Sequence, residues 1–226
     1  MKMKQSTKAI HTPYQRRDAY DALQIPVYNS LAYEFDNADY MSDVFCGKVI
    51  VPDYSRVLNP TVMHFEDRVR NLTGAVEVSA FNSGMAAISA MLMSVAEAGK
   101  NIVSSRHMFG NTYLLVTKTL KRFGVEARLV DLCDIEEVRK VTDKDTCCIF
   151  LETVTNPQTE VADTRELGKI AKEWNIPLIA DTTIVPFTEF DAVANGIDFQ
   201  VVSSTKYISG GATSLGGLII AYGKFP

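Results

Sequence analysis

Apolar and polar residues alternate regularly from Asn59 onward, and the pattern predicts helices and strands in turn. Phe65, Val69 and Leu72 recur at helical spacing until Gly74 ends the helix. Short runs rich in apolar residues then predict seven strands, over 76–81, 101–105, 125–130, 146–151, 176–180, 198–203 and 216–222. Helices are predicted in the gaps, over about 84–97, 111–123, 134–140 and 163–174.

The predicted strands are apolar along their whole length, and the helices between them are amphipathic. Strands of this kind are buried on both faces, which is typical of a parallel sheet with helices packed on each side. The predicted fold class is therefore α/β.

Residues 1–60 show little periodicity but carry many aromatic side chains. We interpret them as an extended arm with short helical pieces, followed by the α/β domain over 61–226. An arm this aromatic is not expected to remain in water, so we predict that it lies on a sister subunit. The aromatic residues are Tyr14, Tyr20, Tyr28, Tyr33, Phe35, Tyr40, Phe45 and Tyr54.

Composition excludes several classes of partner. Apolar residues make up 46% of the 226 residues, enough for a substantial core, and the formal net charge is −4. Such a chain offers no basic face to phosphate backbones, so nucleic acid is not an expected partner. The longest apolar run, near 85–95, is too short to span a bilayer, and the start MKMKQSTKAI has no apolar signal core. We therefore expect neither a membrane partner nor secretion.

Cysteine and histidine do not form a disulfide framework or a metal site. The four cysteines include no C-x-x-C pair, and the three histidines have no ligand spacing. No metal is predicted, and the reducing cytoplasm is the simplest compartment.

Ligands of open α/β sheets bind at the carboxyl ends of the strands. The polar residues that follow the predicted strands are therefore the first candidates for a site. They occupy 82–85, 106–112, 152–157, 181–183 and 203–206.

The stretch NSGMAA leads through Gly84 into a predicted helix. Free backbone N–H groups at a helix start, together with the dipole, favour a phosphate. A plain N-cap by Ser83 explains the same residues and is the simpler interpretation of this stretch alone. The stretch matches neither G-x-G-x-x-G nor G-x-x-x-x-G-K-[ST], so neither a dinucleotide fold nor a P-loop is indicated.

Three further edge residues have both a structural and a chemical interpretation. Asp181 could cap a turn, or it could hold a proton on a heterocyclic nitrogen. Asn156 before Pro157 could form an ordinary turn, or it could donate to a ligand oxygen. The ring of Phe109 could belong to the core, or it could stack on a flat cofactor.

Lys206 stands in the run VVSSTKYISGG, at the end of an apolar strand. A single lysine there is usually solvated. In a partly dry pocket its amine would be free to form a Schiff base, and Ser203 and Thr205 could bind a phosphate beside it. A phosphate cradle, a carboxylate, a stacking ring and a lysine together predict a pyridoxal 5′-phosphate site.

The motifs at these positions resemble those of the Cys/Met-metabolism pyridoxal-phosphate enzymes. That family includes O-acetylhomoserine sulfhydrylase, cystathionine γ-synthase, cystathionine lyases and methionine γ-lyase. The resemblance implies the large domain of the fold type I transferases, with a mostly parallel seven-stranded sheet. The motifs are YSRVLNPT (54–61), NSGMAA (82–87), FGNTY (109–113), ETVTNP (152–157), ADTT (180–183) and SSTKYISGG (203–211).

The resemblance assigns Lys206 as the Schiff-base lysine and proton carrier, and Asp181 as the partner of the ring nitrogen. It assigns Asn156 to the cofactor's 3′ oxygen and Phe109 to its ring face. The phosphate would be held by the backbone N–H groups of Gly84 and Met85 and by the hydroxyls of Ser203 and Thr205.

Tyr54 and Arg56 would come from a neighbouring subunit. Arg56 would hold the phosphate, and Tyr54 would act beside the substrate amine and leaving group. The resemblance therefore implies a dimer at least, and a tetramer in the family.

Three departures refine the prediction. The stacking position, usually tyrosine, is Phe109, which cannot transfer a proton. The lysine is followed by Gly210-Gly211-Ala212-Thr213 where many lyases have glycine, histidine and aspartate, and this variant is similar to the O-acetylhomoserine sulfhydrylase branch. The chain also ends soon after the lysine strand. We interpret this as the absence of a smaller C-terminal domain, and expect this chain alone to turn over poorly.

The predicted reaction is the replacement of acetate on O-acetyl-L-homoserine by sulfide or a thiol, to give homocysteine or methionine. One alternative within the same chemistry is a methionine or cystathionine γ-lyase or a cystathionine γ-synthase. An alternative of another class is an inactive fragment that retains only the cofactor-domain fold and an assembly surface.

Overall fold

The computed structural model describes residues 4–11, 20, 22–186 and 188–225; Tyr14 lies outside this range. Contacts within the chain divide it into two units, Met1–Leu72 and Thr73–Pro226, which are considered separately below.

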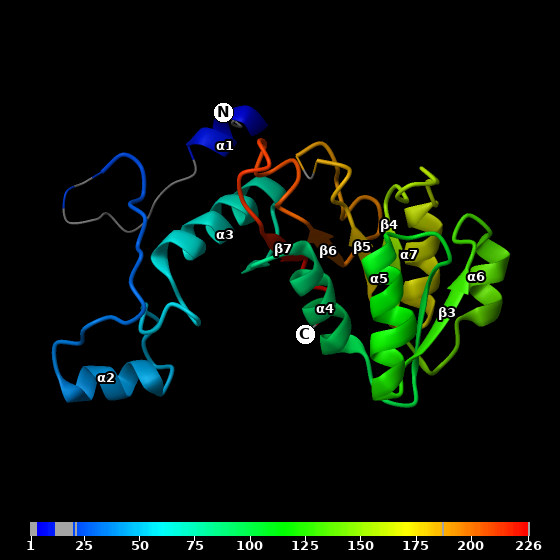
Figure 1. Ribbon diagram of the computed structural model, residues 1–226, viewed down its shortest axis with the longest axis horizontal. Helices are drawn as coiled ribbons and strands as arrows, with labels where there is room; N and C mark the ends of the chain where they lie inside the picture. The colour runs from blue at the N-terminus through cyan, green and yellow to red at the C-terminus, as the bar shows by residue number, and fades with distance from the viewer. Residues whose placement is uncertain (1–3, 12–19, 21, 187, 226) are drawn as a thin grey trace. The chain divides into compact units, whose positions relative to one another are not determined.

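A seven-stranded sheet forms the centre of the second unit (Figure 1). Its strands are β1 (Glu77–Phe81), β2 (Asn101–Ser105), β3 (Glu126–Val130), β4 (Thr146–Glu152), β5 (Leu178–Asp181), β6 (Phe199–Val202) and β7 (Gly217–Ala221). Their order across the sheet is β1-β7-β6-β5-β4-β2-β3; β7 pairs antiparallel with β1 and β6, and the other adjacent strands pair in parallel. The seven predicted strands and the mostly parallel sheet are confirmed.

Helices pack on both faces of this sheet, as predicted. On one face lie α4 (Gly84–Val95) and α5 (Gly110–Leu114), the latter continued by a π-helical turn, η1 (Leu115–Thr119), and a 3₁₀ turn, η2 (Leu120–Phe123). On the other face lie α6 (Ile135–Val141) and α7 (Thr164–Glu173).

Successive side chains of β4 point to opposite faces of the sheet, so the strand packs against both layers of helices. Cys148 and Phe150 belong to the core that includes α4, whereas Ile149 and Leu151 belong to the core that includes α7. All four side chains are almost fully buried, which explains why this strand is apolar throughout.

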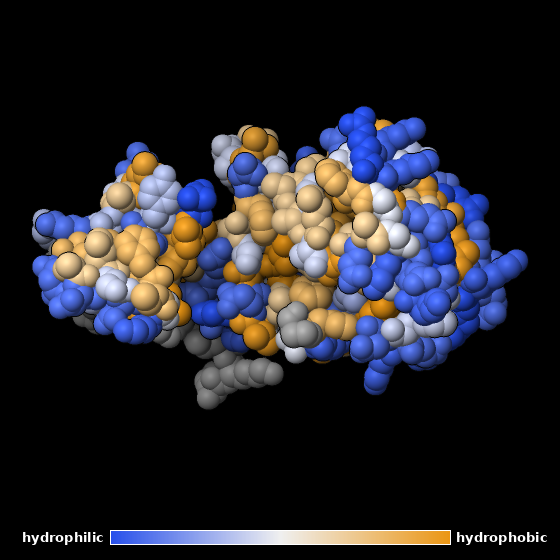
Figure 2. Space-filling view, turned by 90° about the horizontal axis from the view of Figure 1, so that it is seen from below, coloured by the Kyte–Doolittle hydropathy of each residue, from blue (hydrophilic) through white to orange (hydrophobic). Residues whose placement is uncertain are grey.

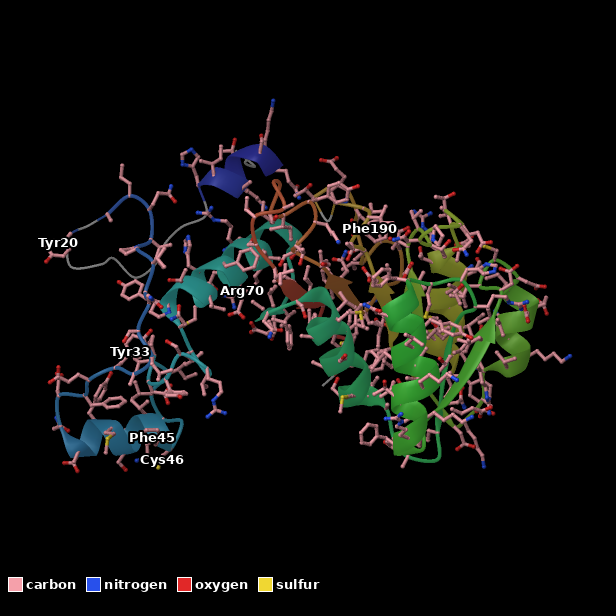
Figure 3. The ribbon with its side chains drawn as sticks, viewed as in Figure 1. Tyr20, Tyr33, Phe45, Cys46, Arg70 and Phe190 are labelled. Atoms are coloured by element: carbon pink, nitrogen blue, oxygen red, sulfur yellow. The ribbon has the colours of Figure 1, made fainter. Side chains whose placement is uncertain are left out.

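The first unit contains α1 (Gln5–Ile10), α2 (Ala38–Phe45) and most of α3 (Pro60–Thr73). Asn59 organises the chain before α3. Its side-chain amide donates to the Tyr28 carbonyl at 3.0 Å, and its Oδ1 accepts from Thr61 N at 2.9 Å. The Tyr33 hydroxyl lies 3.2 Å from Ser55 Oγ (Figure 3). Within the described part of residues 1–60, α1 and α2 are short helical pieces of the kind expected, and the role of this segment as an arm on a sister subunit stays a prediction.

Apolar side chains are unusually exposed on the first unit, and Figure 2 shows several of them on its surface. A surface of this kind is typical of regions that bind another protein. The exposed residues include Val27, Leu31, Met41, Phe45, Ile50 and Val57. Across the described ranges, helices are all too short or too polar to cross a bilayer.

A buried polar network lies beneath the carboxyl end of β5. Gln200 is 0% exposed in the middle of β6, and its Nε2 donates to Thr182 Oγ1 at 3.0 Å. Its Oε1 accepts from the hydroxyl of Tyr222. The network thus links β6 to the residue that follows Asp181.

Removal of the Tyr222 hydroxyl leaves a buried acceptor without its partner. We expect Tyr222→Phe to lower the free energy of unfolding by about 1–3 kcal/mol, measured by urea denaturation. Tyr207→Phe is the matched control, because Tyr207 is 64% exposed and should show little change. Equal losses in the two variants would contradict the role of the network.

Candidate active site

A pocket of about 370 Å³ opens among the loops that follow the carboxyl ends of β1, β2, β4, β5 and β6. Its position is the one expected for a ligand site in an α/β sheet. The structure brings eight of the predicted site residues into its lining: Gly84, Met85, Phe109, Asn156, Asp181, Ser203, Thr205 and Lys206.

The start of α4 presents backbone donors to this pocket. Ser83 caps the helix, with Oγ accepting from Ala86 N at 3.1 Å and its carbonyl accepting from Ala87 N at 3.1 Å. The N–H groups of Gly84 and Met85 have no intrahelical acceptor, because they lie in the first turn. The two interpretations of this stretch are therefore compatible: Ser83 caps the helix, and two donors remain for an anion.

Gly84 allows α4 to approach the end of β6 very closely. A Cβ atom at Gly84 would lie 2.6 Å from Ser203 Cβ and 2.9 Å from Ser203 Oγ. Ser203 is held in turn by its backbone N–H, which donates to Thr183 Oγ1 at 2.8 Å. Any other residue at position 84 would separate the helix start from the serine hydroxyl.

Thr205 and Lys206 differ in whether their side-chain polar groups already have hydrogen-bond partners. Thr205 Oγ1 accepts from Gly216 N at 3.1 Å and donates to Gly216 O at 3.2 Å. The single hydroxyl proton of Thr205 is thus already used in a hydrogen bond. To donate to a phosphate, the hydroxyl must first give up its bond to the Gly216 carbonyl. By contrast, within the described parts of the chain no group pairs with Lys206 Nζ, and the residue is exposed.

Asp181 ends β5 and is held by the turn that follows. Its Oδ1 accepts from Thr183 N at 2.9 Å. Burial raises the pKa of Asp181, while the hydroxyl and the backbone N–H of Thr183 oppose that rise. A desolvated carboxylate of this kind is stabilised when a protonated nitrogen binds beside it.

Glu152 is a pocket residue to which the sequence assigned no role. It ends β4, is only 7% exposed, and accepts backbone N–H groups from Phe109 and Asn156. Burial raises its pKa, the two N–H donors oppose the rise, and the negative charge of Asp181 adds to it. Its position directly after a predicted apolar strand was the feature of the sequence that could have identified Glu152. Asn111 and Thr183, also in the lining, belong to the polar stretches that follow the strands predicted over 101–105 and 176–180.

Tyr54 and Arg56 lie in the first unit, where they contact each other. The Arg56 guanidinium carbon is 5.4 Å from the centroid of the Tyr54 ring, within the range of a cation–π interaction. Tyr54 also forms an antiparallel bridge with Ala32. Their roles in a neighbouring subunit's site stay predictions.

Substitution of Gly84 tests the close approach of α4 to β6. Gly84→Ala forces Cβ against Ser203, so we expect a loss of about 1–3 kcal/mol in the free energy of unfolding. Gly110→Ala is the matched control, since Gly110 is also the first residue of a helix and a Cβ there meets nothing within 4 Å. Denaturation curves that shift equally for both variants would contradict the packing argument.

Comparisons with known proteins identify the family and fold of this chain. The family profile described as Cys/Met metabolism PLP-dependent enzyme matches residues 6–225. The chain is 36% identical over 210 residues to the homocysteine/cysteine synthase of Saccharomyces cerevisiae, covering 92% of this chain and 47% of that protein. It is 34% identical over 224 residues to the L-methionine gamma-lyase of Fusobacterium nucleatum, covering 97% of this chain and 56% of that protein.

A solved structure from Campylobacter jejuni, described as an O-acetylhomoserine (thiol)-lyase, superimposes with a TM-score of 0.93 at 34% identity. The match covers 99% of this chain and 55% of that one, and the C. jejuni protein carries a pyridoxyl-lysine phosphate. The chain spans about half the length of the curated relatives it matches.

Proposed function

Because the chain belongs to the Cys/Met metabolism family of pyridoxal-phosphate-dependent enzymes, we propose that its pocket holds this cofactor for γ-replacement on O-acetyl-L-homoserine. Sulfide or a thiol would replace acetate, giving homocysteine or methionine. The observation that carries the proposal is one pocket lined by Lys206, Asp181 and the open start of α4.

The residues present fit the cofactor. The N–H groups of Gly84 and Met85, which have no acceptor within α4, suit its phosphate, and the absence of a Cβ at Gly84 keeps Ser203 Oγ beside them. The desolvated carboxylate of Asp181 suits a protonated ring nitrogen. Phe109 offers an apolar ring that is 43% exposed at the pocket, as stacking requires.

Pyridoxal phosphate, when bound, supplies the electron sink for a negative charge that develops on the substrate's α carbon. The chain's own part is to bind the cofactor and to move protons. Lys206 Nζ would tether the cofactor covalently until the substrate's amine takes its place, and the released Lys206 amine would then remove the proton from Cα and a second proton from Cβ. Asp181 would keep the ring nitrogen protonated, and Asn156 would donate to the 3′ oxygen.

The second candidate is a γ-lyase. Identity to the L-methionine gamma-lyase, 34%, is close to the 36% found for the homocysteine/cysteine synthase, but the lyases rank below the sulfhydrylases and synthases among the relatives. The run Gly210-Gly211-Ala212-Thr213 after the lysine favours the sulfhydrylase.

We also propose a homo-oligomer in the cytoplasm, a dimer at least and a tetramer by analogy with the family. The exposed apolar residues of the first unit support a protein partner for that unit. In such an assembly Arg56 would bind the phosphate in the neighbouring site, and Tyr54 would act beside the substrate amine.

The covalent role of Lys206 can be tested by borohydride reduction and peptide mapping. We expect a pyridoxyl group on the peptide that contains Lys206, and none on that peptide in Lys206→Ala. Activity of Lys206→Ala should fall by at least about 10²–10⁴-fold, because the proton carrier is lost. Lys118→Ala, at an exposed lysine outside the pocket, is the control. A labelled lysine elsewhere would refute the assignment.

Product analysis separates the two candidate reactions. With O-acetyl-L-homoserine and sulfide, we expect homocysteine to accumulate in proportion to released acetate. A γ-lyase would instead give 2-oxobutanoate and ammonia from methionine or cystathionine. Ammonia as the main product, with little homocysteine, would assign the enzyme to the lyases.

A further inference from the structure

Glu152 joins two loops that approach the pocket from different strands. Its Oε1 accepts the N–H of Phe109 at 2.6 Å, in the loop between β2 and α5. Its Oε2 accepts the N–H of Asn156 at 3.0 Å, in the loop between β4 and α7. Each carboxylate oxygen therefore accepts a hydrogen bond from one loop, and Glu152 itself stands at the end of β4.

We infer that Glu152 is a positioning residue whose carboxylate sets the separation between the Phe109 ring and the Asn156 amide across the pocket. The inference rests on the proposed function, in which the ring stacks on the cofactor and the amide reaches its 3′ oxygen. Glu152 acts through these two residues and needs no contact of its own with the reacting atoms.

A carboxylate offers one acceptor oxygen to each of the two donors. A glutamine has one acceptor oxygen, and its NH₂ group would face the second N–H without a hydrogen bond. Water cannot easily replace the lost acceptor, since Glu152 is 7% exposed. Burial raises the pKa of Glu152 and the two N–H bonds lower it, so the loops help to keep the carboxylate charged.

A second contact links the same two loops nearer the surface. His107 Nδ1 lies 2.8 Å from Glu160 Oε2, and both side chains are more than a third exposed. A solvent-exposed pair of this kind contributes little to holding a geometry. Glu160→Gln is therefore a matched control: it also replaces a glutamate on the β4–α7 loop by its amide, but leaves the bonds of Glu152 intact.

The test compares Glu152→Gln, Glu160→Gln and the unsubstituted chain in binding of pyridoxal phosphate. We expect the dissociation constant, measured by equilibrium dialysis, to rise about 10- to 100-fold in Glu152→Gln and by less than about fivefold in Glu160→Gln. The visible circular dichroism of the bound cofactor should change in Glu152→Gln, because the stacking ring is displaced. An unchanged dissociation constant in Glu152→Gln would overturn the inference.

Amide hydrogen exchange without cofactor separates this inference from the proposed function. In the unsubstituted chain the Phe109 and Asn156 amides should be protected, and in Glu152→Gln at least one should exchange faster. Rapid exchange of both amides in the unsubstituted chain would overturn the inference, even if the variant did not fold. Failure of the unsubstituted chain to bind pyridoxal phosphate would refute the proposed function, while protected amides would still support the link between the loops.

Discussion

The site depends on a close approach across β7. This strand lies between β1 and β6 and runs antiparallel to both, so its first residues lie at the edge where those two strands end. A Cβ atom on Gly217 would lie 2.6 Å from the carbonyl carbon of Ser83. Because β7 begins with glycine, the start of α4 can pass over it and meet Ser203.

The consequence is that the proposed phosphate site is assembled from two strands that are not neighbours. Adjacent strands are about 4.8 Å apart, so β1 and β6 are separated by about twice that distance. Gly84 and Gly217 remove the side chains that would fill the gap, and Gly216 holds Thr205 through its N–H and carbonyl. Backbone donors from one loop and hydroxyls from another thus face the same space.

The sequence predicted which residues line this site better than it predicted the contacts between them. Strand ends are local features, so an apolar run followed by a polar residue was enough to find Asp181, Asn156 and Lys206. The direction of β7 and the role of Glu152 depend on contacts between distant segments; Glu152 and Phe109, for example, are 43 positions apart. The hydrogen bonds that already occupy the Thr205 hydroxyl could not be predicted from the sequence either, because the fold determines which group lies beside it.

The two acidic residues of the pocket differ in how their carboxylates are satisfied. Asp181 and Glu152 both line it, and the charge of Asp181 raises the pKa of Glu152. Glu152 accepts backbone N–H groups from two loops, whereas the donors to Asp181 come from one residue, Thr183. Burial raises the pKa of Asp181, so its carboxylate still needs a positive charge beside it to offset the cost of desolvation. In the proposed reaction a protonated ring nitrogen meets that need, and Phe109, which has no hydroxyl, leaves the movement of protons to Lys206.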